Sequence, residues 1–210
     1  METRHTGDME WTVIIPVKPA AAGKSRLGLG PELARALALD TVAAVVASEA
    51  VGRVIVVTSD PEFHPHGVEI AEEKSPSGID AAIRAGVALS GSGRDAARDA
   101  GPLAALLGDL PSLRPQDLAV ALAAAGRHPR AFVADRESTG TTLVTAAAGV
   151  SLLTAFGAAS AAAHRALGLV QLDLPADSTV TADVDTVEQL ELARGLGVGR
   201  ATRLALRHRA

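Results

Sequence analysis

Three cationic side chains follow the first apolar run of the chain. The run WTVIIPV, residues 11–17, leads into a loop of small residues that carries Lys18, Lys24 and Arg26. Such a β-branched run is typical of a buried strand, and cations at its end can bind the phosphates of a nucleoside triphosphate. We therefore expect a triphosphate-binding loop directly after the first strand.

The end of this loop resembles a P-loop in part. Gly23, Lys24 and Ser25 match the end of the pattern G-x-x-x-x-G-K-[ST], in which backbone N–H groups surround phosphates. Lys18 stands where the first glycine belongs, and Pro19 beside it has no backbone donor. We therefore expect a loop that holds phosphates in another way.

A first acidic candidate is Asp109, in the segment LLGDLPSL. It follows an apolar run, so we expect its carboxylate at the carboxyl edge of a sheet, facing the same crevice as Lys18. The alternative is an acidic turn residue before a proline.

Asp183 and Asp185, in the segment TADVDTVEQL, form a second acidic candidate. Alternate residues of an extended segment face one side, and carboxylates so spaced suit Mg²⁺ bound between the protein and substrate phosphates. Alternatively, Asp185 is the N-cap of the following helix and Glu188 completes a capping box. The two roles are compatible.

Two further segments could bind anions. Residues 139–141, Thr-Gly-Thr, are expected at a tight turn, while Gly157 and Ser160 begin an alanine-rich helix whose free N–H groups attract phosphate or carboxylate. Ser160 as a plain helix cap is the alternative. His164, one turn after Ser160, either contacts the anion or faces solvent.

The apolar runs predict the elements that position these residues. Strand-like runs rich in Val, Ile and Leu occupy residues 11–17, 53–59, 102–108, 130–135 and 141–147. Helical spacing is found at residues 31–50, 77–89, 114–128, 156–164 and 186–197. This alternation predicts an α/β protein with a mixed, mainly parallel sheet and helices on both faces.

The composition limits the class of protein. A chain of 210 residues suits one domain, which we place at residues 11–199, between a flexible N-terminus at 1–10 and a basic C-terminal tail at 200–210. The arginines of the tail favour a frayed helix end over a nucleic-acid contact. A net charge of −4 argues against a nucleic-acid partner, and the lack of cysteine excludes thiolate chemistry. Without an apolar leader or spanning run, we expect a cytoplasmic protein with no membrane partner.

Taken in order, these segments resemble the guanylyltransferases of coenzyme F-420 biosynthesis, which share the nucleotidyltransferase fold of the molybdenum-cofactor guanylyltransferases. The matching segments are IIPVKPAAAGKSRL, SPSGIDAAI, GDLPSL, FVADRESTGTTL, FGAASAAAH and DVDTVEQL. The resemblance covers nearly the whole chain and implies a single Rossmann-like domain of the nucleotide-diphospho-sugar-transferase type.

The resemblance also implies a reaction. A phosphorylated three-carbon acid attacks the α-phosphorus of GTP and releases pyrophosphate, with Mg²⁺ as cofactor. Bacterial members use phosphoenolpyruvate, and 2-phospho-L-lactate is assigned to archaeal ones. The chain is rich in Ala, Arg and Gly, as is typical of a high-GC bacterial genome, so we expect phosphoenolpyruvate.

Individual residues acquire roles from the same resemblance. Lys18 looks like a phosphate-binding lysine, and we expect Lys24 and Arg26 of its loop to act with it in catalysis. The family's Mg²⁺ carboxylates correspond to Asp109, Asp183 and Asp185. Its phosphoenolpyruvate-binding positions correspond to Thr141, Gly157 and Ser160. One departure is Asp80, where the family has asparagine, because an aspartate cannot donate through an amide N–H₂.

Two other functions stay open. One is a nucleotidyltransferase acting on a molybdopterin or a sugar phosphate, and the absence of a G-x-G opening speaks against it. The other is an inactive nucleotide-binding regulator, which retention of the three aspartates disfavours. The acceptor phosphate is ionised near neutral pH, so guanylyl transfer needs no general base and none of the histidines has to serve as one.

Overall fold

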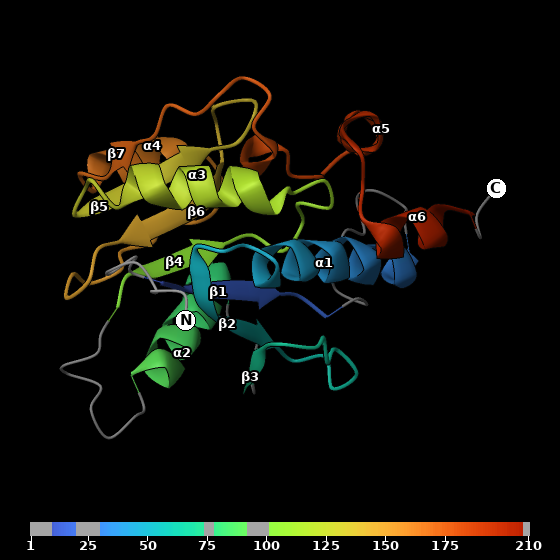
Figure 1. Cartoon of the computed structure of the whole chain (residues 1–210), viewed down its shortest axis with the longest axis horizontal. Coiled ribbons are helices and arrows are strands. Elements are labelled where there is room, and N and C mark those ends of the chain that lie inside the picture. Colours follow the sequence, from blue (N-terminus) through green and yellow to red (C-terminus); the bar gives the residue numbers. More distant parts are fainter. Residues whose placement is uncertain (1–9, 20–29, 74–77, 92–100, 208–210) are drawn as a thin grey trace, which may run out of the picture.

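The computed structural model describes residues 10–19, 30–73, 78–91 and 101–207 of the chain. Within them, seven strands form one sheet in the order β3-β2-β1-β4-β6-β5-β7 (Figure 1). The strands are β1 (Trp11–Val17), β2 (Val51–Thr58), β3 (Glu69–Glu72), β4 (Leu103–Leu106), β5 (Arg130–Ala134), β6 (Thr141–Ala146) and β7 (Val170–Gln171). Strand β6 is antiparallel to β4 and β5, and the other described pairs are parallel. The predicted mainly parallel sheet is confirmed, and β3 and β7 are additional to the five predicted strands.

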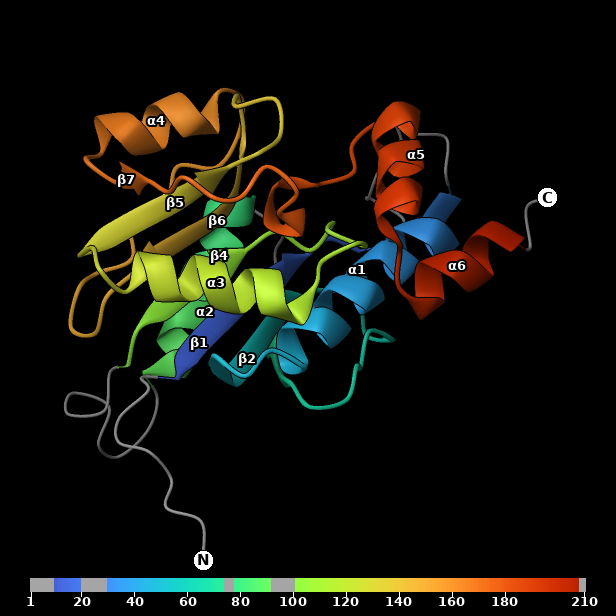
Figure 2. The ribbon, with the colours of Figure 1, turned by 45° about the horizontal axis from the view of Figure 1, so that its top comes forward.

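Helices cover both faces of this sheet (Figure 1, Figure 2). They are α1 (Gly30–Val46), α2 (Ile79–Ser90), α3 (Pro115–Ala125), α4 (Ser160–Ala166), α5 (Val187–Leu196), α6 (Arg200–Arg207) and the 3₁₀ turn η2 (Thr179–Thr181). Val13 and Ile15 of β1 pack into the core beneath α1 and α3, while Ile14 between them packs with Ala82 of α2. Because successive strand residues face opposite sides, a strand covered on both faces reads as a continuous apolar run.

Strand β5 is covered in the same way. Val133 belongs to the core beneath α3, whereas Phe132 packs with Ala161 of α4 on the opposite face. Helices α2 and α4 therefore share one face of the sheet, and α1 and α3 share the other. No helix in the described part of the chain combines the length and the apolar character needed to cross a bilayer.

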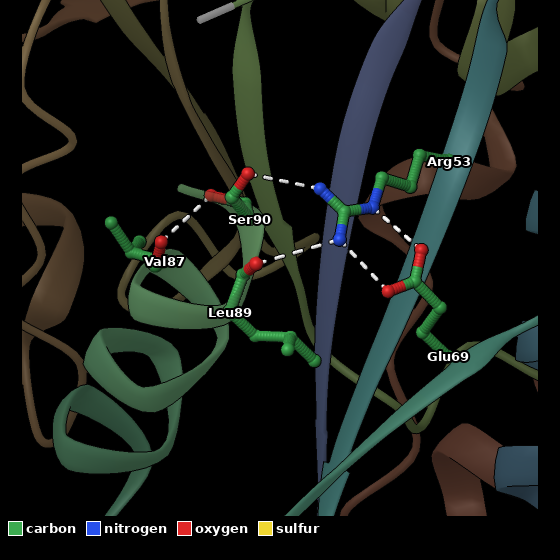
Figure 3. A network of polar contacts seen from close by, with 5 residues as sticks. All are labelled: Arg53, Glu69, Val87, Leu89 and Ser90. Atoms are coloured by element: carbon green, nitrogen blue, oxygen red, sulfur yellow. Dashed lines mark hydrogen bonds and ion pairs between the residues drawn. The ribbon is translucent and has the colours of Figure 1, made fainter. Parts of the chain in front are cut away.

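Near the amino end of β2, the side chain of Arg53 links two strands of the sheet to the end of α2 (Figure 3). Its guanidinium donates to both carboxylate oxygens of Glu69 at 2.7 and 2.8 Å, and to the carbonyls of Ser90 at 3.0 Å and Leu89 at 3.4 Å. The hydrogen bond with Arg53 holds the pKa of Glu69 below its usual value. Both side chains are partly exposed, so the pair stabilises modestly and its main effect is to join β2, β3 and the end of α2.

The segment predicted as a basic tail is, over residues 200–207, the packed helix α6. It lies against α1 (Figure 2). Within α6, Thr202 is fully buried. The carboxylate of Asp40 in α1 accepts the N–H groups of Ala201 at 2.9 Å and Thr202 at 2.8 Å. An acidic side chain from another helix thus satisfies the first N–H groups of α6, where the helix dipole favours negative charge. The folded unit therefore continues past residue 199.

Candidate functional site

The carboxyl ends of β1, β4 and β5 meet the beginning of β6 at one edge of the sheet. Leu106, at the end of β4, pairs with Leu143, and Ala134, at the end of β5, pairs with Thr141. Because β6 is antiparallel, its first residue Thr141 lies at the edge where its neighbours end. Lys18, exposed after β1, emerges at the same edge. The structure thus gathers predicted site residues where ligands bind in open α/β sheets.

Two contacts hold Asp109 at this edge. The buried Thr41 of α1 accepts the N–H of Leu110 at 2.9 Å through its hydroxyl oxygen, and the hydroxyl donates to the carbonyl of Leu37 at 2.9 Å. Gly108 packs against the end of β1, where an added Cβ would lie 3.2 Å from the carbonyl oxygen of Pro16. The turn that carries Asp109 is therefore fixed by α1 on one side and β1 on the other.

The second acidic segment is tied directly to this turn. The N–H of Val184 donates to the carbonyl of Asp109 at 3.0 Å, which brings Asp183 and Asp185 to the same edge. Val184 itself is fully buried. One backbone hydrogen bond thus joins two segments that are far apart in the sequence.

Asp185 is not the cap of α5, so that interpretation is wrong. The N-cap is Thr186, whose side chain accepts the N–H of Gln189, while the Gln189 side chain accepts the N–H of Thr186. Gln189 therefore takes the place that we assigned to Glu188 in the capping box.

Two acidic residues that the sequence analysis did not single out, Asp135 and Glu137, lie close to Asp183. Carboxylate oxygens of Asp135, Glu137 and Asp183 lie within 4.8 Å of one another. Asp135 follows β5 directly, and Glu137 accepts a hydrogen bond from Gln189 at 2.9 Å. Their position two residues apart after a strand, in the segment VADRES, is the same signal that identified Asp183 and Asp185.

The turn at residues 135–140 binds a carboxylate of its own chain. Asp135 accepts the N–H of Thr139 at 2.9 Å and that of Gly140 at 2.6 Å. A Cβ on Gly140 would overlap the Asp135 carboxylate, which explains the glycine. Two N–H groups of the turn that we predicted to bind an anion are therefore occupied by Asp135.

Ser160 is the first residue of α4 and not its cap. The N-cap is Ala159, in a left-handed conformation with φ 55°, and no side chain caps the helix. The N–H of Ser160 donates to Gly157 and that of Ala161 to Thr139, so the first amides of α4 have partners in the chain. Gly157 is exposed and has φ 143°, a conformation that favours glycine.

His164 is fully buried, so of the two alternatives for this residue the solvent-facing one is wrong. Its Nδ1 lies 2.9 Å from Oγ1 of Thr141, and its Nε2 accepts the N–H of Ala155 at 2.9 Å. The rings of Phe132 and Phe156 lie 5.6 and 5.2 Å from the imidazole. Burial lowers the pKa of His164, and the charge of Asp80 and a hydrogen bond to the backbone of Ser160 oppose this only in part.

Asp80 holds the residue next to Ala155. Its Oδ1 accepts the N–H of Phe156 at 3.1 Å, which links the start of α2 to the loop before α4. An asparagine could make the same contact through its side-chain oxygen, so this contact survives the departure from the family pattern. Lys24 and Arg26 lie outside the described residues, and their predicted roles stay predictions.

Comparison with known proteins agrees with this architecture. The model of the MobA-like NTP transferase domain matches residues 21–180, and the chain belongs to this class of nucleotidyltransferases. A solved structure assigned to the nucleotide-diphospho-sugar transferases, from Desulfovibrio desulfuricans, superimposes with a TM-score of 0.68 at 17% identity and covers 95% of both chains. At this identity the likeness shows the fold alone.

Curated relatives narrow the class. The phosphoenolpyruvate guanylyltransferase of Streptomyces scabiei is 47% identical over 94% of this chain and 96% of its own length. The protein of that name from Streptomyces coelicolor is 47% identical over 92% of this chain and 94% of its own. The chain therefore belongs to the phosphoenolpyruvate guanylyltransferase family.

Proposed function

We propose that this protein transfers GMP from GTP to phosphoenolpyruvate. A phosphate oxygen of phosphoenolpyruvate attacks the α-phosphorus of GTP, and the bond from that phosphorus to the oxygen bridging the β-phosphate breaks. Pyrophosphate leaves, and the product is enolpyruvyl-diphospho-5′-guanosine. We propose further that this reaction serves coenzyme F-420 biosynthesis, as the resemblance found in the sequence implies, and that it takes place in the cytoplasm, as the sequence leads us to expect.

The observation that carries the proposal is the convergence at one sheet edge. Lys18 after β1, Asp109 after β4, Thr141 at the start of β6 and Asp183 beside Asp109 come from four separate segments. Such a set combines a cation for phosphates, carboxylates for a divalent ion and a hydroxyl for an anionic acceptor. An identity of 47% to phosphoenolpyruvate guanylyltransferases over nearly the whole chain supports GTP and phosphoenolpyruvate as the substrates.

The residues at this edge fit Mg²⁺. Asp109 and Asp183 offer hard carboxylate oxygens on two segments joined by a hydrogen bond, and Asp135 and Glu137 add oxygens within 4.8 Å of those of Asp183. We assign the ion to Asp109, Asp183 and Asp185, with Asp135 and Glu137 as further neighbours. When bound, Mg²⁺ would neutralise the charge that develops on the transferring phosphoryl group.

The chain's own residues then bind and orient. Lys18 contacts the phosphates of GTP, while Thr141, Gly157 and Ser160 position the acid on the opposite side of the α-phosphorus. The buried Thr41 keeps the Asp109 turn in place through Leu110. Because the attacking phosphate is already ionised, alignment and charge neutralisation supply the catalysis.

Pyrophosphate release tests the proposal. The protein is mixed with Mg²⁺, each of the four common ribonucleoside triphosphates in turn, and phosphoenolpyruvate, glucose 1-phosphate or no acceptor. We expect release that requires both GTP and phosphoenolpyruvate and that EDTA abolishes. Release with the sugar phosphate alone would support a sugar nucleotidyltransferase instead, and no release with any pair would indicate an inactive regulator.

A further inference from the structure

The hydrogen bonds of His164 define its tautomer. Nε2 accepts the N–H of Ala155, so this nitrogen carries a lone pair and no proton. In a neutral imidazole the proton is then on Nδ1, and Nδ1–H donates to Oγ1 of Thr141 at 2.9 Å. A doubly protonated ring would turn the Ala155 contact into two opposed N–H groups. Complete burial between Phe132 and Phe156 also favours the neutral form.

This tautomer determines what the hydroxyl of Thr141 can do. An oxygen that accepts from Nδ1–H keeps its own proton, and that proton must be donated elsewhere. Among the described residues, His164 is the hydrogen-bond partner found for this side chain. The hydroxyl lies at the sheet edge where the phosphorylated acid is expected to bind. An anionic oxygen of that acid therefore accepts the hydrogen bond that the hydroxyl donates.

His164 also holds the loop that carries Gly157. Its Nε2 binds the N–H of Ala155, and Oδ1 of Asp80 binds the N–H of the next residue, Phe156. Two consecutive amides are thus fixed by side chains from two different helices, α4 and α2. The same imidazole therefore touches both segments assigned to the acid, the start of β6 and the loop before α4.

We propose that His164 is a positioning residue that makes Thr141 a hydrogen-bond donor to the phosphorylated acid. The inference rests on the proposed function for the identity of that acid. His164 does not contact the substrate and does not transfer a proton. It acts by fixing the polarity of one hydroxyl and, through Ala155, the course of the loop next to it.

Two variants distinguish the role of Nδ1 from that of Nε2. His164→Asn places an amide near the position of Nδ1, so it can still donate to Thr141 but cannot reach Ala155. His164→Gln places an amide near Nε2, so it can still accept from Ala155 but leaves Thr141 without its donor. We expect the Gln variant to raise KM for phosphoenolpyruvate about tenfold, and the Asn variant by less than about threefold, with KM for GTP unchanged in both.

A double variant provides the readout that a merely structural role would not give. Thr141→Val alone should raise KM for the acid as much as His164→Gln does, and more than Thr141→Ser, which keeps the hydroxyl. The pair Thr141→Val and His164→Gln should be no worse than Thr141→Val, because both changes remove one interaction. Additive losses, a parallel rise in KM for GTP, or an Asn variant as impaired as the Gln variant would overturn the proposal.

The tautomer can be measured without any substrate. Long-range ¹H–¹⁵N correlation spectra of the wild-type protein, with the His164 signal assigned by its loss in His164→Gln, should show a protonated Nδ1 and an unprotonated Nε2. An Nε2–H tautomer or an imidazolium at pH 7 would overturn the proposal. If the tautomer is as expected but phosphoenolpyruvate is not a substrate, the proposed function fails, while the hydrogen bond by which His164 fixes the Thr141 hydroxyl stands.

Discussion

Replacing Thr41 by valine tests whether a residue remote from the ligands positions Asp109. Valine has nearly the shape of threonine but no hydroxyl, so the buried N–H of Leu110 loses its acceptor. Leaving a buried donor unsatisfied costs about 1–3 kcal/mol. For a domain of this size that corresponds to a decrease in Tm of about 2–12 °C.

The effect on catalysis should exceed the effect on folding. Without the hydroxyl, the turn at Gly108 and Asp109 is no longer held to α1, and a displacement of about 1 Å in a phosphoryl-transfer site can cost about 100-fold. We expect Thr41→Val to lower kcat/KM by about 10- to 100-fold. Pyrophosphate release measured well below the Tm of the variant gives this number.

Thr41→Ser is the matched control. It keeps the hydroxyl and removes one buried methyl group, which costs about 1 kcal/mol in stability. Its kcat/KM should stay within about threefold of the wild type. If the Val and Ser variants have equal kcat/KM, Thr41 contributes packing alone and the reasoning about Asp109 is refuted.

Three further predictions concern the site, the C-terminal helix and pH. Asp109→Asn should fold normally but lose about 100-fold or more in kcat, because a carboxylate is removed where charge develops; near-normal turnover would reject its metal role. Gly199→Ala should lower the Tm, since its Cβ would overlap Asp40, whereas Gly195→Ala in α5 meets no atom within 4 Å and should leave the Tm unchanged or raised; equal effects would contradict the packing of α6. Burial lowers the pKa of His164 from 6.5, so below about pH 6.5 the unfolded chain binds a proton that the folded chain does not, and the free energy of unfolding should fall as the pH drops. Denaturant titrations at several pH values should show this contribution to the pH dependence in the wild type and not in His164→Gln.

The sheet could be predicted because its strands are buried on both faces. The run at β1 is apolar at every position except Thr12, since Ile14 and Ile15 pack on opposite faces, and it ends where Lys18 begins. The place of Asp109 followed from the same pattern. Strands β3 and β7 could not be predicted, because EIAE and VQ are short, half polar and lie at the two outer positions of the sheet.

The errors lie where tertiary contacts decide between equivalent local patterns. Spacing placed His164 on the same side of a helix as Ser160, but whether that side is buried depends on β5 and β6, which supply Phe132 and Thr141. Two overlapping capping patterns exist before α5, and the chain uses Thr186 with Gln189.

Other features depend on partners that are distant in the sequence. The N–H groups of α6 are satisfied by Asp40, about 160 residues earlier, and no local signal indicates this. The grouping of Asp135 with Asp183 likewise depends on the path of the chain after β5. Composition and periodicity predict elements, while these contacts follow only from their arrangement.

Competition between two acceptors tests the central claim most directly. Wild-type protein is given GTP, Mg²⁺ and equal concentrations of phosphoenolpyruvate and 2-phospho-L-lactate, and the products are resolved by mass spectrometry. The two acids differ by one carbon–carbon double bond, which makes phosphoenolpyruvate planar where phospholactate is tetrahedral and carries a methyl group. A difference this small is worth about 1–3 kcal/mol to a pocket, so we predict that enolpyruvyl-diphosphoguanosine exceeds the lactyl product by about 5- to 150-fold. A dominant lactyl product would contradict the assignment of the acceptor, and the absence of both products would contradict guanylyl transfer itself.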